Sequence, residues 1–235
     1  FFWLVTSAFC YALGLSCFAW FWHGSLRLLQ QTPRISEAFG SYFISHLGKY
    51  VPGKALVVVI RSELVKSSRT SLSSAVTGVF IETLGMMAVG AVTAGLILAF
   101  NHRTLQNPTL LWISLGFGFA AGIPASPPLF RRTIRFLAKR KRIGNLQDQI
   151  SHLTLRNIFP FWIVCIVGWL WLGASMLAIL EAFPESLFNQ PIDASIAPLA
   201  MSCVALAMVA GFISLIPGGA GVREYIILAL LGPTL

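Results

Sequence analysis

Charged residues are scarce in this chain of 235 residues, where Asp, Glu, Lys and Arg together make up only 11%. A soluble domain of similar length usually carries about 25% charged residues. Hydrophobic residues fill 56% of the chain, and the mean hydropathy is +0.77. This composition argues against an ordinary soluble domain and predicts an integral membrane protein.

Signatures of catalysis are also missing. The sequence holds no P-loop, no Gly-x-Ser-x-Gly, no His-Glu-x-x-His and no Cys-x-x-Cys. Its four cysteines lie in apolar runs without metal-ligand spacing, so we expect buried thiols that pack as small hydrophobic groups. We therefore expect no catalytic residue, no metal site and no cofactor. No nucleic-acid motif accompanies the net charge of +9, so we interpret that charge as membrane topology and lipid contact.

The chain does contain long apolar runs, at 1–22, 75–100, 109–123, 158–180 and 194–216. A membrane-spanning helix needs about 20 mostly apolar residues, and several of these runs reach that length. Four tryptophans lie near the ends of runs, as in the aromatic belts of membrane proteins: Trp3, Trp20, Trp22 and Trp112. We therefore predict an all-α polytopic transmembrane bundle. Because the sequence begins inside one run and stops soon after another, we expect it to be truncated at both ends, with further helices on each side.

The distribution of basic residues predicts the orientation of this bundle. Seven of the 17 Lys and Arg residues lie at 131–142, which places the 131–156 loop in the cytoplasm. The 181–193 loop has three acidic residues and no basic one, as expected outside. A single transmembrane domain then divides into a first half at 1–130 and an incomplete second half at 157–235. Apolar residues at helical spacing in the basic loop also fit an amphipathic helix on anionic headgroups, and this alternative stays open.

Two Pro-Gly breaks interrupt the apolar sequence, one at 48–54 and the other at 216–221. Proline removes a backbone donor and glycine weakens a helix, so each break predicts a broken helix. Backbone freed in hydrocarbon must be buried in protein or face a wet cavity. Basic residues on both sides of the 37–60 stretch are expected to face the cytoplasm, so this stretch is predicted to enter the membrane and return as a re-entrant hairpin. The residues that form the breaks are Pro52, Gly53, Pro217, Gly218, Gly219 and Gly221.

The two breaks also indicate an inverted repeat. Each follows an apolar run, at 1–22 and at 158–180, and each precedes an arginine at a similar distance. Three full crossings separate the two units in this topology, so the second unit runs in the opposite direction. Interrupted segments in two inverted halves predict a site between the halves, near the middle of the membrane.

Arg223 and Glu224 would lie in the first turn of the half-helix that follows the second break. A helix N-terminus attracts anions, and a guanidinium binds phosphate through two parallel hydrogen bonds, so a phosphate site is one interpretation. Lys49, Lys54 and Arg61 would add positive charge from the first half. The alternative is that Arg223 pairs with a carboxylate such as Glu82 and ties two helices together.

Glu82 is the one charged residue within the 71–100 run. A carboxylate there is costly to bury, so it should face the interior of the bundle. It could serve as counter-ion to one of the two arginines, as a proton site or as a hydrogen-bond anchor between helices. Of these roles we expect the counter-ion.

With these residues in place, the sequence resembles the flippase-like transmembrane family related to lysylphosphatidylglycerol synthase membrane regions. The matching features are a Pro-Gly element followed by Arg61, then Glu82, then a Pro-Gly-Gly-x-Gly-x-Arg-Glu motif that ends at Glu224. Thr83 and Met86 stand where the family often has an arginine and an acidic residue. The resemblance implies an all-helical fold with re-entrant segments and a role in moving lipids between leaflets.

The leading hypothesis is therefore translocation of an anionic or polyprenyl-phosphate-type lipid through a polar intramembrane cavity. Arg61 and Arg223 would hold the phosphate, and Glu82 and Glu224 would hold those arginines when the site is empty. The alternative is a membrane module of an enzyme that transfers an aminoacyl or glycosyl group to lipid. A third reading is a scaffold for lipid- or cell-wall-synthesis enzymes. The expected location is the cytoplasmic membrane of a prokaryote, with membrane lipids as partners.

Overall fold

The structure is a computed structural model that describes residues 1–50, 55–100, 153–184, 196–214 and 216–232, with a few single positions between 112 and 188. Most of the 109–123 run and most of the 131–156 loop therefore lie outside the described residues. The described elements are α1 (Phe2–Leu28), α2 (Ile35–Ser45), η1 (His46–Tyr50), α3 (Ala55–Val65), α4 (Leu72–Phe100), α8 (Leu155–Leu180), α9 (Ala197–Ile213), η6 (Pro217–Gly219) and α10 (Val222–Leu231). Over these ranges the chain is helical and has no strand, which confirms the all-α prediction.

Three of the helices, α1, α4 and α8, are long and apolar enough to cross a membrane. The 194–216 run instead gives the shorter α9, which ends at Ile213, just before the second break. α1 continues past the apolar run that ends at residue 22, because the segment from His23 to Leu26 is buried in the bundle. This extension makes the aromatic-belt prediction wrong for Trp22, which lies inside a helix and is fully buried. Trp3, Trp20 and Trp112 are exposed, as that prediction requires.

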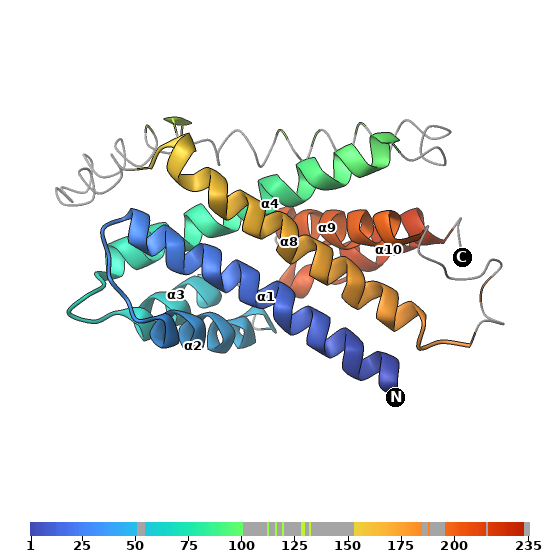
Figure 1. Cartoon of the computed structure of the whole chain (residues 1–235), viewed down its shortest axis with the longest axis horizontal. Helices are drawn as coiled ribbons and strands as arrows, with labels where there is room; N and C mark the ends of the chain where they lie inside the picture. The colour runs from blue at the N-terminus through green and yellow to red at the C-terminus, as the bar shows by residue number, and fades with distance from the viewer. Residues whose placement is uncertain are drawn as a thin grey trace.

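α1 and α8 lie side by side and run in opposite directions across the molecule (Figure 1). The Ser7 and Ser175 hydroxyl groups are 2.9 Å apart near the start of α1 and the end of α8. Near the other end, a Cβ at Gly24 would overlap the Phe161 ring. Small residues thus let the two helices approach closely. Their opposite directions are those that the inverted repeat predicts for the helix before each break.

Each break lies between two helices that pack against each other as a hairpin. The first hairpin is α2, η1 and α3, and the second is α9, η6 and α10. In both, the two helices pack against each other, and the hairpins enter the bundle from opposite ends (Figure 1). Their tips meet, because η1 contacts η6. The two broken-helix elements predicted from the Pro-Gly breaks are therefore next to each other in space.

α4 bridges the two hairpins. Its first half packs on α3 of the first hairpin, and its second half packs on α9 of the second. In the second contact, Val209 of α9 is buried among Met87, Ala88 and Ala91 of α4. α4 therefore offers one continuous surface against which both hairpins are positioned.

The base of the first hairpin is closed by hydrogen bonds between the two loops that flank it. The Thr32 amide donates to the Arg69 carbonyl (3.2 Å), and the Ser71 amide donates to Oε1 of Gln31 (2.8 Å). Glu37 accepts from Nη2 of Arg69 (2.8 Å) and from the Arg34 amide (2.8 Å), which caps α2. These bonds join the α1–α2 loop to the α3–α4 loop, so both ends of the hairpin are fixed at one face.

A first prediction concerns the contact between α8 and α9. A Cβ at Gly173 would lie 2.8 Å from Cβ and 2.9 Å from Cα of Met201, so neither atom can move without shifting the α9 backbone. We expect Gly173→Ala to destabilise the protein by roughly 1–3 kcal/mol, as overpacking does. The measurement is thermal unfolding in detergent. The control is Gly40→Ala, because a Cβ at Gly40 has no neighbour within 4 Å and should leave the melting temperature unchanged or slightly higher. Equal effects of the two substitutions would contradict the close contact.

A second prediction concerns Glu37. The hydrogen bond from the Arg34 amide, followed by the charges of Arg69 and Arg34, lowers the pKa of this carboxyl below its ordinary value of 4.5. A carboxyl whose pKa is lower in the folded protein stabilises the fold above its unfolded pKa. That contribution is lost as the pH falls through the folded pKa. Glu37→Gln should therefore make the melting temperature less dependent on pH below about 4.5 and lower it near neutral pH. A pH profile parallel to that of the wild type would disprove this role.

Candidate functional site

The centre of the candidate site is an ion pair between the first hairpin and α4. Nη1 of Arg61 on α3 donates to Oε2 of Glu82 on α4 at 2.9 Å. Arg61 is 4% exposed and Glu82 is 1% exposed, so both charges are removed from solvent. The structure therefore confirms Glu82 as a counter-ion and identifies Arg61 as its partner. The alternative in which Arg223 pairs with Glu82 is wrong, because α3, not α10, brings its arginine to this carboxylate.

Side chains from three further positions complete the surroundings of the pair. The Tyr42 hydroxyl donates to Oε1 of Glu82 (3.2 Å), and Nε of Arg61 donates to the Ser45 hydroxyl (3.0 Å). The guanidinium carbon lies 4.1 Å from the centre of the Tyr42 ring and 5.5 Å from that of Trp22. Burying two charges costs several kcal/mol per ion unless hydrogen bonds and aromatic faces replace water. Helices α1, α2, α3 and α4 all contribute to this compensation.

The sequence did not identify Tyr42, Ser45 or Trp22 as parts of this site. A signal was available for the first two, because the predicted re-entrant stretch contains hydroxyl groups that would need partners inside the membrane. No comparable signal exists for Trp22, since its position under Arg61 depends on how α1 packs against the hairpin.

Thr83 and Met86, where the resemblance led us to expect an arginine and an acidic residue, follow Glu82 on α4. Thr83 donates its hydroxyl to Oε2 of Glu82 (3.3 Å). The carbonyl of Met86, one turn further along α4, accepts from Nε1 of Trp169 on α8 (3.1 Å). A neutral hydroxyl thus supports the carboxylate at the first position, and the backbone anchors α8 at the second. Neither Thr83 nor Met86 adds a charge to the site.

The second break owes its shape to three glycines. Gly218, Gly219 and Gly221 have φ values of 64°, 71° and 81°, which side chains other than glycine rarely adopt. Gly219 also lies against the preceding helix, because a Cβ there would be 2.8 Å from Cα of Gly211. The backbone therefore requires these glycines, a reason additional to the helix break that the sequence predicts. Pro52, Gly53, Lys49 and Lys54 at the first break lie outside the residues whose side chains the structure describes.

Arg223 follows this turn directly and lies in the first turn of α10. Its side chain packs over two glycines, since a Cβ at Gly211 or Gly219 would lie 2.7 or 2.8 Å from Nε. Nε is buried and has no hydrogen-bond partner among the described residues. Arg223 also makes no ion pair with any of them. A buried donor without an acceptor is unfavourable, so this guanidinium is available to an anion. Glu224 is exposed and is not paired with Arg223.

The arrangement brings both arginines onto hairpins whose tips touch, but it gives them different surroundings. Arg61 is engaged by Glu82 and Ser45, whereas Arg223 has a buried donor free. Among the described residues, no group of three His, Cys, Asp or Glu side chains could hold a metal ion. The chemistry that this region can offer is therefore the binding of an anion by a guanidinium at the start of a helix.

A family model described as the lysylphosphatidylglycerol synthase TM region matches residues 1–234. The chain therefore belongs to that family, which confirms the resemblance drawn from the two Pro-Gly motifs. Comparisons with curated proteins and with solved structures gave no significant match. Family membership and the three helices of spanning length together establish an integral membrane protein.

The ion pair generates a third prediction. Arg61→Ala leaves Glu82 buried without its counter-ion and should destabilise the protein by about 3–5 kcal/mol. Replacing both residues with apolar ones, as in Arg61→Met with Glu82→Leu, should recover most of that loss because no unpaired charge remains. Thermal unfolding in detergent measures both variants. Glu63→Gln, which removes an exposed partner of Lys66, is the control and should change stability by less than about 0.5 kcal/mol. A double variant as unstable as the single one would show that the pair is not the cause.

Proposed function

We propose that this protein moves a phosphate-bearing lipid between the two leaflets of a membrane, with the headgroup passing the junction of the two hairpins. The observation that carries the proposal is Arg223. Its guanidinium lies beside the junction, on a half-helix start, with a buried donor that no described residue accepts. Anionic and polyprenyl-phosphate-type lipids share the phosphate that such a group binds.

The two arginines have separate roles in this proposal. Arg223 binds the phosphate through its guanidinium, next to the N-terminus of α10, and Lys49 and Lys54, which flank the first break in the sequence, would add positive charge. Arg61 holds the first hairpin against α4, because both its Nε and its Nη1 already have partners. The sequence alone led us to expect that both arginines bind the phosphate, whereas in this proposal only Arg223 does.

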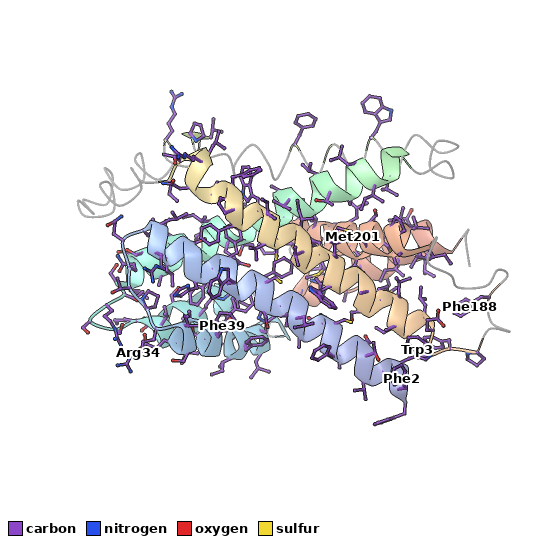
Figure 2. The ribbon with its side chains drawn as sticks, in the orientation of Figure 1. Phe2, Trp3, Arg34, Phe39, Phe188 and Met201 are labelled. Atoms are coloured by element: carbon purple, nitrogen blue, oxygen red, sulfur yellow. The ribbon has the colours of Figure 1, made fainter. Side chains whose placement is uncertain are left out.

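The proposed orientation places the base of the first hairpin in the cytoplasm. Basic residues gather at that end of the bundle: Arg27, Arg34, Lys66, Arg69 and Arg156. Figure 2 shows Arg34 at the opposite end of the molecule from Phe2 and Trp3. An excess of Lys and Arg marks the cytoplasmic side of membrane proteins, and the cytoplasmic membrane of a prokaryote remains the proposed location. Movement of one half against the other would then open the junction to each leaflet in turn.

A second candidate function follows from the family's printed name, which refers to a synthase. In that case the chain is the membrane module of an enzyme that transfers an aminoacyl group to a lipid, and the junction presents the lipid to a catalytic domain. Both candidates require a phosphate at Arg223. Only the first requires movement of the lipid between leaflets.

The test of the leading proposal is lipid flipping in liposomes. Purified protein is reconstituted with a fluorescent phosphatidylglycerol, and the label in the outer leaflet is bleached to measure the fraction that has crossed. Arg223→Ala should slow flipping about tenfold or more, because a charge-assisted bond to phosphate is lost, and Arg223→Lys should retain part of the rate. Arg156→Ala, which removes an exposed arginine at the start of α8, should flip at the wild-type rate.

The outcomes separate the candidates. Equal rates for wild type and Arg223→Ala would refute the role of this arginine in transport. Absence of flipping by the wild type, combined with retention of phosphatidylglycerol in native mass spectrometry that is lost in Arg223→Ala, would favour the membrane-module function.

A further inference from the structure

Two glycines hold the Arg223 side chain in place. A Cβ at Gly211, near the end of α9, would lie 2.7 Å from Nε and 2.9 Å from Cγ of Arg223. A Cβ at Gly219, in η6, would lie 2.8 Å and 3.2 Å from the same two atoms. The stem of the arginine therefore fills the space that side chains at both positions would need. We call Gly211 and Gly219 the glycine cradle of Arg223.

The two positions of the cradle lack side chains for different reasons. Gly219 has a φ of 71°, which is strained for any other residue. Gly211 lies within α9 and is not among the residues with positive φ. Glycine makes a helix less stable than alanine does, so the backbone alone does not favour it here. The three atoms nearest to a Cβ at Gly211 are Nε, Cγ and Cδ of Arg223, so the space at this position is used by the arginine.

An arginine that is already held binds an anion more tightly than one that is free to move. A mobile arginine side chain loses rotamer freedom when it binds a ligand, and this loss lowers the affinity. Arg223 loses that freedom on folding, because the cradle fixes its stem before a ligand arrives. Arg223 makes no ion pair with the described residues, so packing in the cradle, rather than a charged partner, sets the direction of its guanidinium.

We infer that Gly211 is a positioning residue of the anion site, because it holds the Arg223 guanidinium in the direction in which a phosphate binds. The inference rests on the proposed role of Arg223 and adds the residue through which α9 controls that arginine. Gly211 acts only through Arg223, since a glycine offers no side chain to a ligand.

The alternative is that Gly211 only lets η6 pack closely on α9. A Cβ at Gly219 would lie 2.8 Å from Cα of Gly211, so the two backbones are close. In that case Gly211→Ala lowers stability whether or not the Arg223 side chain is present. In the cradle, by contrast, Gly211→Ala is unfavourable only while the arginine is there, because Arg223→Ala removes the three atoms nearest to the new methyl group.

The test is a double-mutant cycle in the full-length protein, purified in detergent. Wild type, Gly211→Ala, Arg223→Ala and the double variant are compared by thermal unfolding and by their Kd for short-chain phosphatidylglycerol. Inorganic phosphate is titrated in parallel, because it distinguishes the free ion from a lipid headgroup as the source of the phosphate. The control is Gly40→Ala, at a second helical glycine whose Cβ would meet no atom within 4 Å.

Gly211→Ala should raise the Kd about threefold to tenfold, the change expected when one arginine loses its fixed orientation. The double variant should bind no more weakly than Arg223→Ala, because Gly211 acts through that arginine. In thermal unfolding the sign should reverse: Gly211→Ala lowers the melting temperature of the wild type, but it preserves or raises that of Arg223→Ala. Gly40→Ala should leave the Kd unchanged.

Two results would overturn the inference while leaving the anion site intact: an unchanged Kd in Gly211→Ala, or an equal loss of stability from Gly211→Ala with and without the Arg223 side chain. An unchanged Kd in Arg223→Ala would refute the anion site itself and the inference with it, so the two failures are distinguishable.

A second measurement serves if Gly211→Ala alone does not fold. Ethylguanidinium is added to Arg223→Ala and to the double variant, and phosphatidylglycerol binding is measured again. The empty cradle should hold the free ion and restore binding only where Gly211 is retained, because the methyl group of Gly211→Ala fills the same space. Equal binding by the two variants would overturn the inference.

Discussion

The Arg61–Glu82 ion pair is the interaction on which the arrangement of the first hairpin depends. Two charges this deeply buried are stable together only in the geometry that supplies both with partners. Those partners come from both arms of the hairpin and from α4, so a shift of α3 along α4 by one residue would break several bonds at once. The hydrogen-bonded base of the hairpin restrains the other end. The first hairpin is therefore attached to α4 at the ion pair and restrained at its base.

The second hairpin is held by different forces. Its contacts with the bundle are apolar packing, such as Gly173 of α8 against Met201 and Met87, Ala88 and Ala91 of α4 against Val209. Van der Waals packing of this kind is lost gradually as helices slide, whereas a buried ion pair is lost at once. Three glycines with positive φ near the tip, Gly218, Gly219 and Gly221, also give α10 a turn with little side-chain restraint. If one half moves against the other, the second hairpin is the part whose movement costs less.

Much of this architecture could be predicted from the sequence, because the signals were local. The two Pro-Gly breaks identified both hairpins, and the lone carboxylate of the 71–100 run had to face an arginine. The choice between Arg61 and Arg223 could not be made, since it depends on which hairpin arm lies over Glu82. Trp22 was misassigned for a similar reason. The end of an apolar run predicts the end of a membrane helix. α1 instead continues past its apolar run, because tertiary packing buries the polar residues that follow.

The two hairpins and the helices before them therefore share an arrangement and differ in electrostatics. An inverted repeat fixes where helices break and which way they run, but it does not require equivalent charges to have equivalent partners. Here Arg61 is neutralised within the described fold, and Arg223 has a buried donor left over. A fully paired arginine contributes to rigidity and gains nothing from a ligand, whereas an incompletely satisfied one gains free energy from any anion that reaches it. The anion-binding role that we propose for Arg223 rests on this asymmetry rather than on the symmetry of the repeat.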